Sequence, residues 1–443
     1  MKNSMQRRML AVTALSAVAI IGLAGCGISP GPSADATSPT TDAPVTLNLG
    51  WWGSDPRAKA TEAAVGAFEK KYPNITVETS YSDWAGYWDR LATQTAGGDA
   101  PDVSQMDMTY LSSYASRGIL ADLGPVKNIL DTSTIPKTVL DSGRVDGKLY
   151  AAPIGAAANG VVINTSLLDK YGIEIPDTNT WTWDDFNKIA LEVTEKSKGA
   201  AHGVTPYQND PFGLQIYARQ HGEELWDARG KVTVSPKLVK EYFQTELDWV
   251  ASGAAPSASQ VSDNGGATIT ERDIATGKTA IFFTAAGAFN GLQAAAPDYK
   301  YIIGNWPTDS HTKPGFQYLK PTMYWAISAA TEHPSEAALL VNFLINDRRV
   351  AKLFGTERGA PASPSLQKVI EPTLTPEGVQ ALDFSKLMTK EAGPAPAITP
   401  NGASGVSAIL SRYNDQVLFG QTSPASAAKG FIDELQASID AAG

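Results

Sequence analysis

The sequence predicts an α/β protein whose folded part has two domains. Short apolar runs typical of strands alternate with segments of helical period, and the turns between them are short. The part able to fold, residues 45–443, comprises about 400 residues, which is more than one ordinary hydrophobic core accommodates. It contains no cysteine, so we expect packing alone to stabilise both domains.

The first alternating series begins directly after residue 44. Residues 45–52 are an apolar run that predicts a buried strand, and residues 56–71 predict a helix because Ala63, Ala64 and Phe68 share one of its sides. The series continues with a strand at 75–81, a helix at 83–95, a strand at 101–106, a helix at 109–117 and a strand at 149–153. Repetition of this kind indicates an open sheet covered by helices.

A second series of the same kind starts with a strand at 161–164. Its next helix begins at Thr182, whose hydroxyl can cap the first turn, while Asp184 and Asp185 complement the helix dipole. The series continues with a strand at 202–206, a helix at 235–251, a strand at 278–283 and mostly helical segments beyond residue 334. We therefore expect a second α/β unit after the first.

The N-terminus carries an export signal. Three basic residues precede the apolar stretch 9–23, and the small residues after it end at Cys26, the only cysteine in the chain. This arrangement resembles a bacterial lipoprotein box, which implies cleavage of residues 1–25 and lipidation of the Cys26 thiol on the outer face of a membrane. The alternative is an ordinary signal peptide with an incidental cysteine. The stretch is too short to span a bilayer comfortably.

Residues 26–44 predict a flexible tether between the lipid and the folded part. They are rich in Ser, Thr, Pro, Ala and Gly and contain one large apolar residue, Ile28. Such a composition cannot bury enough surface to offset the entropy of ordering the chain.

The charge balance excludes some classes of partner. The chain has 36 Lys and Arg against 46 Asp and Glu, and removal of the signal leaves 33 basic residues, a net charge of about −13. An acidic protein without basic tracts is not expected to bind nucleic acid or anionic lipid headgroups. The four histidines are scattered without close metal-ligand spacing, so we expect no metal and no cofactor.

Six short stretches along the chain point to a known family. They are APDV at 100–103, YASRGIL at 114–120, DGKLYAAP at 146–153, VINT at 162–165, GKTAI at 277–281 and WAIS at 325–328. In this order, behind a lipoprotein signal, they resemble the family 1, sugar-specific extracellular solute-binding proteins of ABC importers, such as the maltodextrin- and oligosaccharide-binding proteins.

The resemblance implies a two-lobed, periplasmic-binding-protein-like fold of type II with several hinge crossings. Lobe one would comprise residues 45–155 and 287–328, and lobe two residues 156–286 and 329–443. The first crossing falls in the small, permissive residues 155–160, as a hinge requires.

The ligand is then expected in the cleft between the lobes, at loops that follow strands. Sugar rings present C–H faces that lie on aromatic side chains, and their hydroxyls need carboxylate, amide or guanidinium partners. Candidate ligand-binding residues of these types are Trp51, Trp52, Asp55, Arg57, Asp83, Trp84, Asp107, Asn159, Gln208, Phe212, Phe289, Trp306, Tyr324, Trp325 and Arg358. Trp226, in a later loop, is a further aromatic candidate. For each of them a core, capping or salt-bridge role remains the alternative.

The resemblance implies a monomeric lipoprotein that captures a carbohydrate outside the cell and delivers it to a membrane permease, without a cofactor and without breaking a bond. One departure limits the transfer of specificity: the maltodextrin binders have a ligand-contacting glutamate in the first crossing, where this chain has Ala157. The sugar and its length therefore do not follow from the sequence.

Two other functions remain open. A lipid-anchored glycoside hydrolase would also need aromatic residues and two opposed carboxyl groups in a cleft. However, the sequence contains none of the nucleophile-elbow, zinc-protease or phosphate-loop motifs. A binder of peptides or polyamines would favour charge recognition over stacked aromatic rings.

Overall fold

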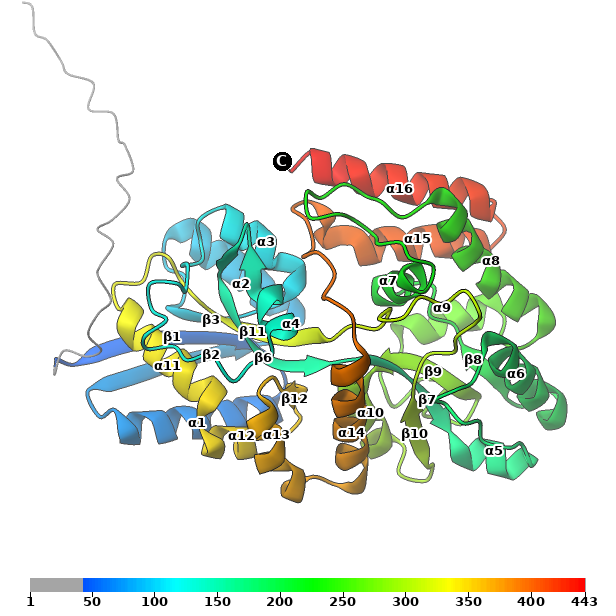
Figure 1. Cartoon of the computed structure of the whole chain (residues 1–443), viewed down its shortest axis with the longest axis horizontal. Helices are drawn as coiled ribbons and strands as arrows, with labels where there is room; N and C mark the ends of the chain where they lie inside the picture. The colour runs from blue at the N-terminus through cyan, green and yellow to red at the C-terminus, as the bar shows by residue number, and fades with distance from the viewer. Residues whose placement is uncertain (1–42, 443) are drawn as a thin grey trace, which may run out of the picture. The chain divides into compact units, whose positions relative to one another are not determined.

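The computed structural model describes residues 43–442 and confirms the expected α/β class (Figure 1). The predicted signal peptide, Cys26 and nearly all of the predicted tether lie outside the described residues. Within the described part, the chain forms two β-sheets with their helices, and we call the two units lobe one and lobe two. One hydrophobic cluster surrounds the six-stranded sheet and extends to Phe289, Ile303 and Phe384 of the other unit, and a second cluster lies within that unit.

Lobe one is built on a six-stranded sheet of order β12-β6-β11-β3-β1-β2. Its strands are β1 (Val45–Trp52), β2 (Ile75–Ser82), β3 (Val103–Met106), β6 (Ala151–Ala157), β11 (Lys320–Ile327) and β12 (Ala360–Pro361). β1 runs parallel to β2 and β3, whereas β11 is antiparallel to both β3 and β6. Every side chain of β3 and β6 is buried, as expected for central strands covered by helices on both faces.

Lobe two is built on a four-stranded sheet of order β10-β7-β9-β8. Its strands are β7 (Asn159–Asn164), β8 (His202–Thr205), β9 (Thr279–Ala285) and β10 (Tyr301–Gly304). β8 and β9 are parallel, and β7 is antiparallel to both of its neighbours. A separate two-stranded ribbon, β4 (Arg144–Val145) with β5 (Lys148–Leu149), precedes β6.

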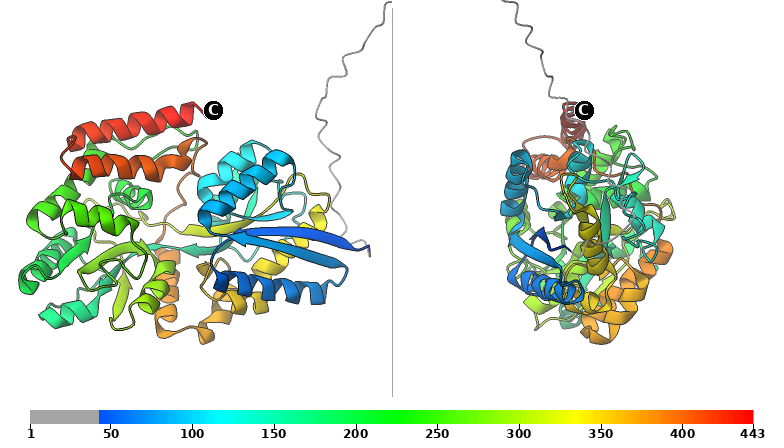
Figure 2. Two further views of the ribbon diagram at one scale, coloured as in Figure 1. Left: turned by 180° about the vertical axis from the view of Figure 1, so that it is seen from behind. Right: turned by 90° about the vertical axis from the view of Figure 1, so that its left-hand side faces the viewer.

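Helices cover both sheets, and the figures show those of lobe one grouped apart from those of lobe two (Figures 1 and 2). With lobe one pack α1 (Asp55–Lys71), α2 (Trp84–Gly97), α3 (Met108–Ser116), α4 (Lys137–Leu140), α11 (Pro334–Asn346), α12 (Arg348–Phe354) and α13 (Pro364–Ile370). With lobe two pack α5 (Thr165–Tyr171), α6 (Trp183–Ser197), α7 (Pro211–Gln220), α8 (Pro236–Ser252), α9 (Ala258–Gly266), α10 (Ala286–Ala295), α14 (Pro376–Glu391), α15 (Val406–Leu418) and α16 (Pro424–Asp440).

The predicted helix start at Thr182 has the expected local chemistry. The Thr182 hydroxyl accepts the Asp185 N–H at 3.1 Å, and the Asp185 carboxylate accepts the Thr182 N–H at 2.9 Å. This reciprocal capping box satisfies two backbone donors that the first turn would otherwise leave unpaired. This capping box involves only Thr182 and Asp185, which are three residues apart, so the sequence alone was enough to predict it.

The chain returns to lobe one later than the expected position at 287. β10 pairs with β7 in the lobe-two sheet, with Tyr301 opposite Asn164, so the return falls between Gly304 and Lys320. The apolar run Tyr301–Gly304 supplies the partner that the outer edge of β7 requires. The boundary of lobe one at 287 is therefore corrected to the start of β11.

The assignment of residues 329–443 to lobe two is also wrong for the helices α11, α12 and α13. The apolar face of α11 packs on β1, β6 and β11, and the Phe343 ring lies 5.5 Å from the Phe68 ring of α1. Residues 334–370 thus belong with lobe one, and α14, α15 and α16 with lobe two. Helical periodicity identifies the buried face of a helix, but not the sheet that this face covers.

Among residues 43–442, no helix combines the length and the apolar character needed to cross a membrane.

Candidate functional site

The chain passes from lobe one to lobe two directly beside the strand on which it returns. In the outgoing direction, only Ala158 separates the end of β6 in lobe one from the start of β7 in lobe two. On the neighbouring strand, Lys320 at the start of β11 is the register partner of Ala157, and the Gln317 side-chain amide donates to the Asn159 carbonyl at 3.2 Å. The expected crossing at 155–160 therefore consists of two strand ends and one connecting residue, held against the returning strand.

A cavity of about 230 Å³ lies next to this crossing and is lined by both lobes. Lobe one contributes residues from the starts of α2 and α3, lobe two contributes residues around α7, and β11 contributes Lys320. The lining residues are Trp84, Asp107, Met108, Thr109, Pro211, Phe212, Gln215, Leu225, Trp226, Tyr318, Lys320, Pro396, Ala397, Thr399, Val406 and Ser407.

Aromatic side chains form much of the cavity wall. Trp84, at the first position of α2, is 44% exposed although it belongs to an aromatic cluster. Its ring centre lies 5.0 Å from that of Trp52 and 5.5 Å from that of Trp88, both in a T-shaped arrangement. These contacts hold the exposed indole in place. On lobe two, the Trp226 indole N–H donates to the Ala397 carbonyl at 3.0 Å. Both rings are thus held by neighbours in the way that a stacking surface requires.

Two carboxylates cap helices near the cavity, and of these Asp107 is a lining residue, whereas Asp210 directly precedes the lining residue Pro211. Asp107 caps α3, accepting the Thr109 N–H at 2.8 Å, and Asp210 caps α7, accepting the Phe212 N–H at 2.9 Å. Burial raises the pKa of Asp210, while the Phe212 N–H and the Lys320 ammonium act against this increase. Carboxylates at helix N-termini are stabilised as anions and accept hydrogen bonds from ligand hydroxyls.

A larger opening of about 780 Å³ adjoins the inner cavity. The two spaces share Pro396 and Ala397, and the larger one is lined by residues of α3 and the β4–β5 ribbon on one side and by residues 228–230 on the other. At its rim the Asn401 amide donates to the Ser116 hydroxyl at 2.7 Å, a direct contact between the lobes. The larger opening and the inner cavity are therefore neighbouring spaces that meet at residues 396 and 397.

The structure brings three of the predicted site residues, Trp84, Asp107 and Phe212, together in the inner cavity, with Trp226 beside them. Most of the other predicted side chains are at least nine-tenths buried inside a lobe. These are Trp51, Trp52, Tyr324, Trp325 and Arg358 in lobe one, Gln208 and Trp306 in lobe two, and Phe289 on α10 of lobe two, whose ring packs into the hydrophobic cluster that extends from lobe one. Asn159 lies at the crossing.

The remaining predicted residues have local partners in lobe one. Asp83 caps α2 by accepting the Gly86 N–H at 2.8 Å, and Asp55 accepts the Tyr81 hydroxyl at 3.2 Å. Arg57 forms an ion pair with Glu357 at 2.8 Å. These are the capping and salt-bridge roles that the sequence left open as alternatives.

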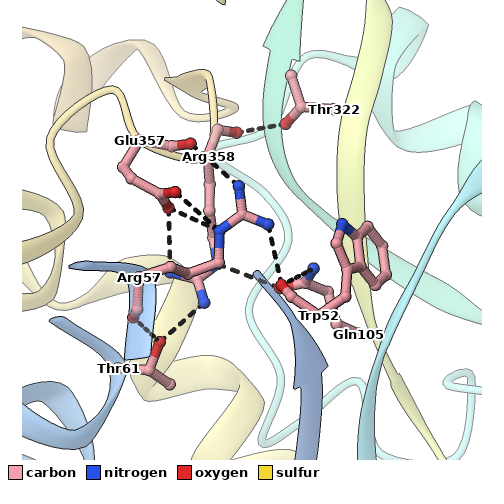
Figure 3. Close-up of polar contacts among 7 residues, drawn as sticks. All are labelled: Trp52, Arg57, Thr61, Gln105, Thr322, Glu357 and Arg358. Atoms are coloured by element: carbon pink, nitrogen blue, oxygen red, sulfur yellow. Dashed lines mark hydrogen bonds and ion pairs between the residues drawn. The ribbon is translucent and has the colours of Figure 1, made fainter. Parts of the chain in front are cut away.

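Arg358 is the centre of a buried polar cluster in lobe one (Figure 3). Its guanidinium donates to the Thr61 hydroxyl at 2.8 Å and to the Gln105 side-chain oxygen at 3.2 Å, and it lies 4.5 Å from the Phe354 ring. Burial lowers the pKa of Arg358 to about 9, with the nearby Arg57 acting in the same direction. Through these contacts Arg358 holds the loop before β12 against α1 and β3.

Several residues of the inner cavity escaped the sequence analysis, among them Lys320, Tyr318 and Gln215. Lys320 is one lysine at the start of an apolar strand, a pattern that also describes an ordinary strand end. The feature that marks Lys320 as a cavity residue is its contact with Phe212, whose ring centre lies 3.5 Å from the ammonium nitrogen. The two residues are 108 positions apart, so the sequence gives no sign of this contact. Among residues 43–442, no three His, Cys, Asp or Glu side chains converge as metal ligands.

Comparison with known proteins identifies the family. The sequence profile of the bacterial extracellular solute-binding proteins matches residues 52–349, about two thirds of the chain. The chain belongs to this family. Residues 52–349 run from the last residue of β1 into α12, so the match includes the lobe-two sheet, β2, β3, β6 and β11 of lobe one, and the crossing between the lobes.

Two relatives extend this result for the solute-binding protein. It is 26% identical over 362 residues to an uncharacterized lipoprotein of Streptomyces antibioticus, which covers 77% of this chain and 74% of that protein. It is 29% identical over 196 residues to the melibiose/raffinose/stachyose-binding protein MelE of Bacillus subtilis, covering 44% and 43% of the two chains.

A solved structure supports the two-lobed fold. The family 1 extracellular solute-binding protein of Alicyclobacillus acidocaldarius superposes with a TM-score of 0.72 at 27% identity, covering 90% of this chain and 99% of that one. The expected periplasmic-binding-protein-like fold is thus confirmed for this solute-binding protein.

Proposed function

We propose that this solute-binding protein captures an intact carbohydrate between its lobes and delivers it to the permease of an ABC importer. The observation that carries the proposal is the inner cavity, in which Trp84 of lobe one and Trp226 of lobe two face the same space as Asp107. Indole faces suit the C–H faces of a sugar ring, and a carboxylate suits its hydroxyls.

Closure follows from the position of the cavity. A ligand that contacts α2 and α3 on one lobe and α7 on the other binds best when both lobes approach it, so it shifts the population toward a closed form. The adjoining opening supports a ligand that extends beyond one sugar ring. The permease would then recognise the closed form. We expect a monomer, because the surface that docks onto the permease must stay free.

Membrane attachment is part of the proposal. The lipoprotein-type sequence ending at Cys26 and the Ser/Thr/Pro-rich residues 26–44 would anchor the protein on the extracytoplasmic face, and the relative from Streptomyces antibioticus is itself described as a lipoprotein. Mass spectrometry of protein extracted from membranes tests this: an N-terminal acylated Cys26 is expected. An unmodified N-terminus elsewhere contradicts the anchor.

The decisive experiment measures thermal stability of the purified protein against mono- and oligosaccharides, amino acids, short peptides and polyamines, with chromatography of each ligand afterwards. A saturable rise in Tm with an intact sugar is expected, since a ligand that binds only the folded state stabilises it by mass action. Release of sugar fragments would instead identify a glycoside hydrolase. A response only to peptides or polyamines would overturn the carbohydrate ligand.

A further inference from the structure

Lys320 occupies a special position at the junction of the lobes. It is the first residue of β11, its register partner is Ala157 beside the crossing, and its side chain lines the inner cavity. Its ammonium nitrogen lies 3.5 Å from the centre of the Phe212 ring. The Lys320 ammonium makes no ion pair or hydrogen bond with any residue in the described range 43–442. The three donors of the ammonium are therefore available to a ligand in the cavity.

The electrostatic partners of Lys320 come from both lobes. Burial lowers the pKa of the Lys320 ammonium, whereas Asp107 of lobe one and Asp210 of lobe two raise it. The cavity lining thus combines the Asp107 carboxylate, which accepts hydrogen bonds, with the Lys320 ammonium, which donates them. Within residues 43–442 Lys320 forms no ion pair with Asp107 or Asp210, so Asp107 and Lys320 can each take a partner from the ligand.

We infer that Lys320 determines the charge specificity of this cleft and that the ligand is an uncharged carbohydrate. The inference rests on the proposed function and narrows it to a ligand class. A hydroxyl both donates and accepts, so one sugar can donate to Asp107 and accept from Lys320 without bringing a charge of its own. A uronate would meet the Asp107 carboxylate and the negative field of Asp210 behind it, and a polyamine would meet the Lys320 ammonium, so each charged class faces a repulsive group.

Lys320 can be tested without dismantling the fold. Its packing contact is the Phe212 ring, and in Lys320→Met the unbranched side chain keeps this contact while the charge is lost. Lys313 provides a matched control because it is an exposed lysine in the same connecting segment and does not line the inner cavity. Unchanged Tm values of both variants without ligand would show that folding is intact.

The experiment is isothermal titration calorimetry of wild type, Lys320→Met and Lys313→Met. The ligands are neutral di- and trisaccharides (melibiose, lactose, raffinose, maltotriose), digalacturonic acid and spermidine. We expect wild type to bind a neutral sugar in preference to both charged ligands. Lys320→Met should weaken that binding roughly 10- to 100-fold, the usual effect of losing a hydrogen bond from a charged donor, and Lys313→Met should not change it.

Each other outcome overturns a defined part of the argument. Preferential binding of digalacturonic acid, or neutral-sugar binding unaffected in Lys320→Met, would overturn the role of Lys320 while the carbohydrate-binding function stands. Binding of spermidine alone, or of no carbohydrate in the panel, would overturn both.

Discussion

Glu246 of α8 provides the sharpest prediction about stability. Its side chain is 1% exposed in lobe two, and burial raises its pKa to about 8, an effect that a hydrogen bond from Asn414 of α15 opposes and nearby Asp415 reinforces. One Glu246 oxygen, Oε2, and Asn414 Oδ1 are both buried without a hydrogen-bond partner among residues 43–442. A protonated carboxyl supplies a donor that the carboxylate lacks.

The sign of the pH dependence follows from this pKa. Glu246 keeps its proton in the folded state up to about pH 8, whereas in the unfolded chain it loses the proton near its ordinary pKa of 4.5. The folded state therefore binds more protons between these values, and the free energy of unfolding falls as the pH rises through this window. At pH 7.5 the loss relative to pH below 4 amounts to about 4 kcal/mol, at about 1.4 kcal/mol for each pH unit.

Glu246→Gln should remove this loss because the amide is neutral at every pH. We expect urea unfolding of the variant to give a free energy of unfolding above that of wild type by about 3–4 kcal/mol at pH 7.5, and by only about 1 kcal/mol at pH 5.5. Glu241→Gln, on the same helix but with a side chain that is 45% exposed, serves as the control. A difference between Glu246→Gln and wild type that is the same at both pH values would refute the reasoning.

Three further predictions concern the cleft, the buried arginine and the crossing strand. Trp84→Ala should weaken sugar binding at least about tenfold in calorimetry with little change in Tm, because it removes an exposed stacking face; equal affinity would exclude Trp84 from the site. Arg358→Leu should lower the free energy of unfolding by about 2–3 kcal/mol in urea denaturation, since a buried hydrogen-bond acceptor loses its donor; an unchanged midpoint would contradict this. Gly155→Ala should lower the free energy of unfolding by about 1–3 kcal/mol in the same assay, because the new Cβ would lie 2.6 Å from the Arg358 carbonyl oxygen. Gly66→Ala, which has open space around it, should not destabilise the protein. Equal effects of the two substitutions would argue against crowding at β6.

The candidate site was predicted only in part, and particular residues show why. Asp107 and Trp84 follow strands that the sequence located, so their position at the cleft edge of the sheet could be inferred. Trp51 and Trp52 are adjacent on β1, yet neither lines the inner cavity, because Trp51 stacks on Tyr81 and Trp52 supports Trp84 from behind. Lys320 carries no local signal at all.

The sequence by itself determined the α/β class, most strands and helices, the capping box at Thr182 and the family, since these depend on local periodicity and on motifs written in order along the chain. Tertiary structure alone decided which sheet α11 covers, where the chain returns to lobe one, and which aromatic side chains stay exposed. It also placed Lys320 beside Phe212 and within the electrostatic influence of carboxylates from both lobes. The physical reason is that a cavity forms from segments whose packing brings them together, and periodicity records whether a side chain is buried but not against which distant partner.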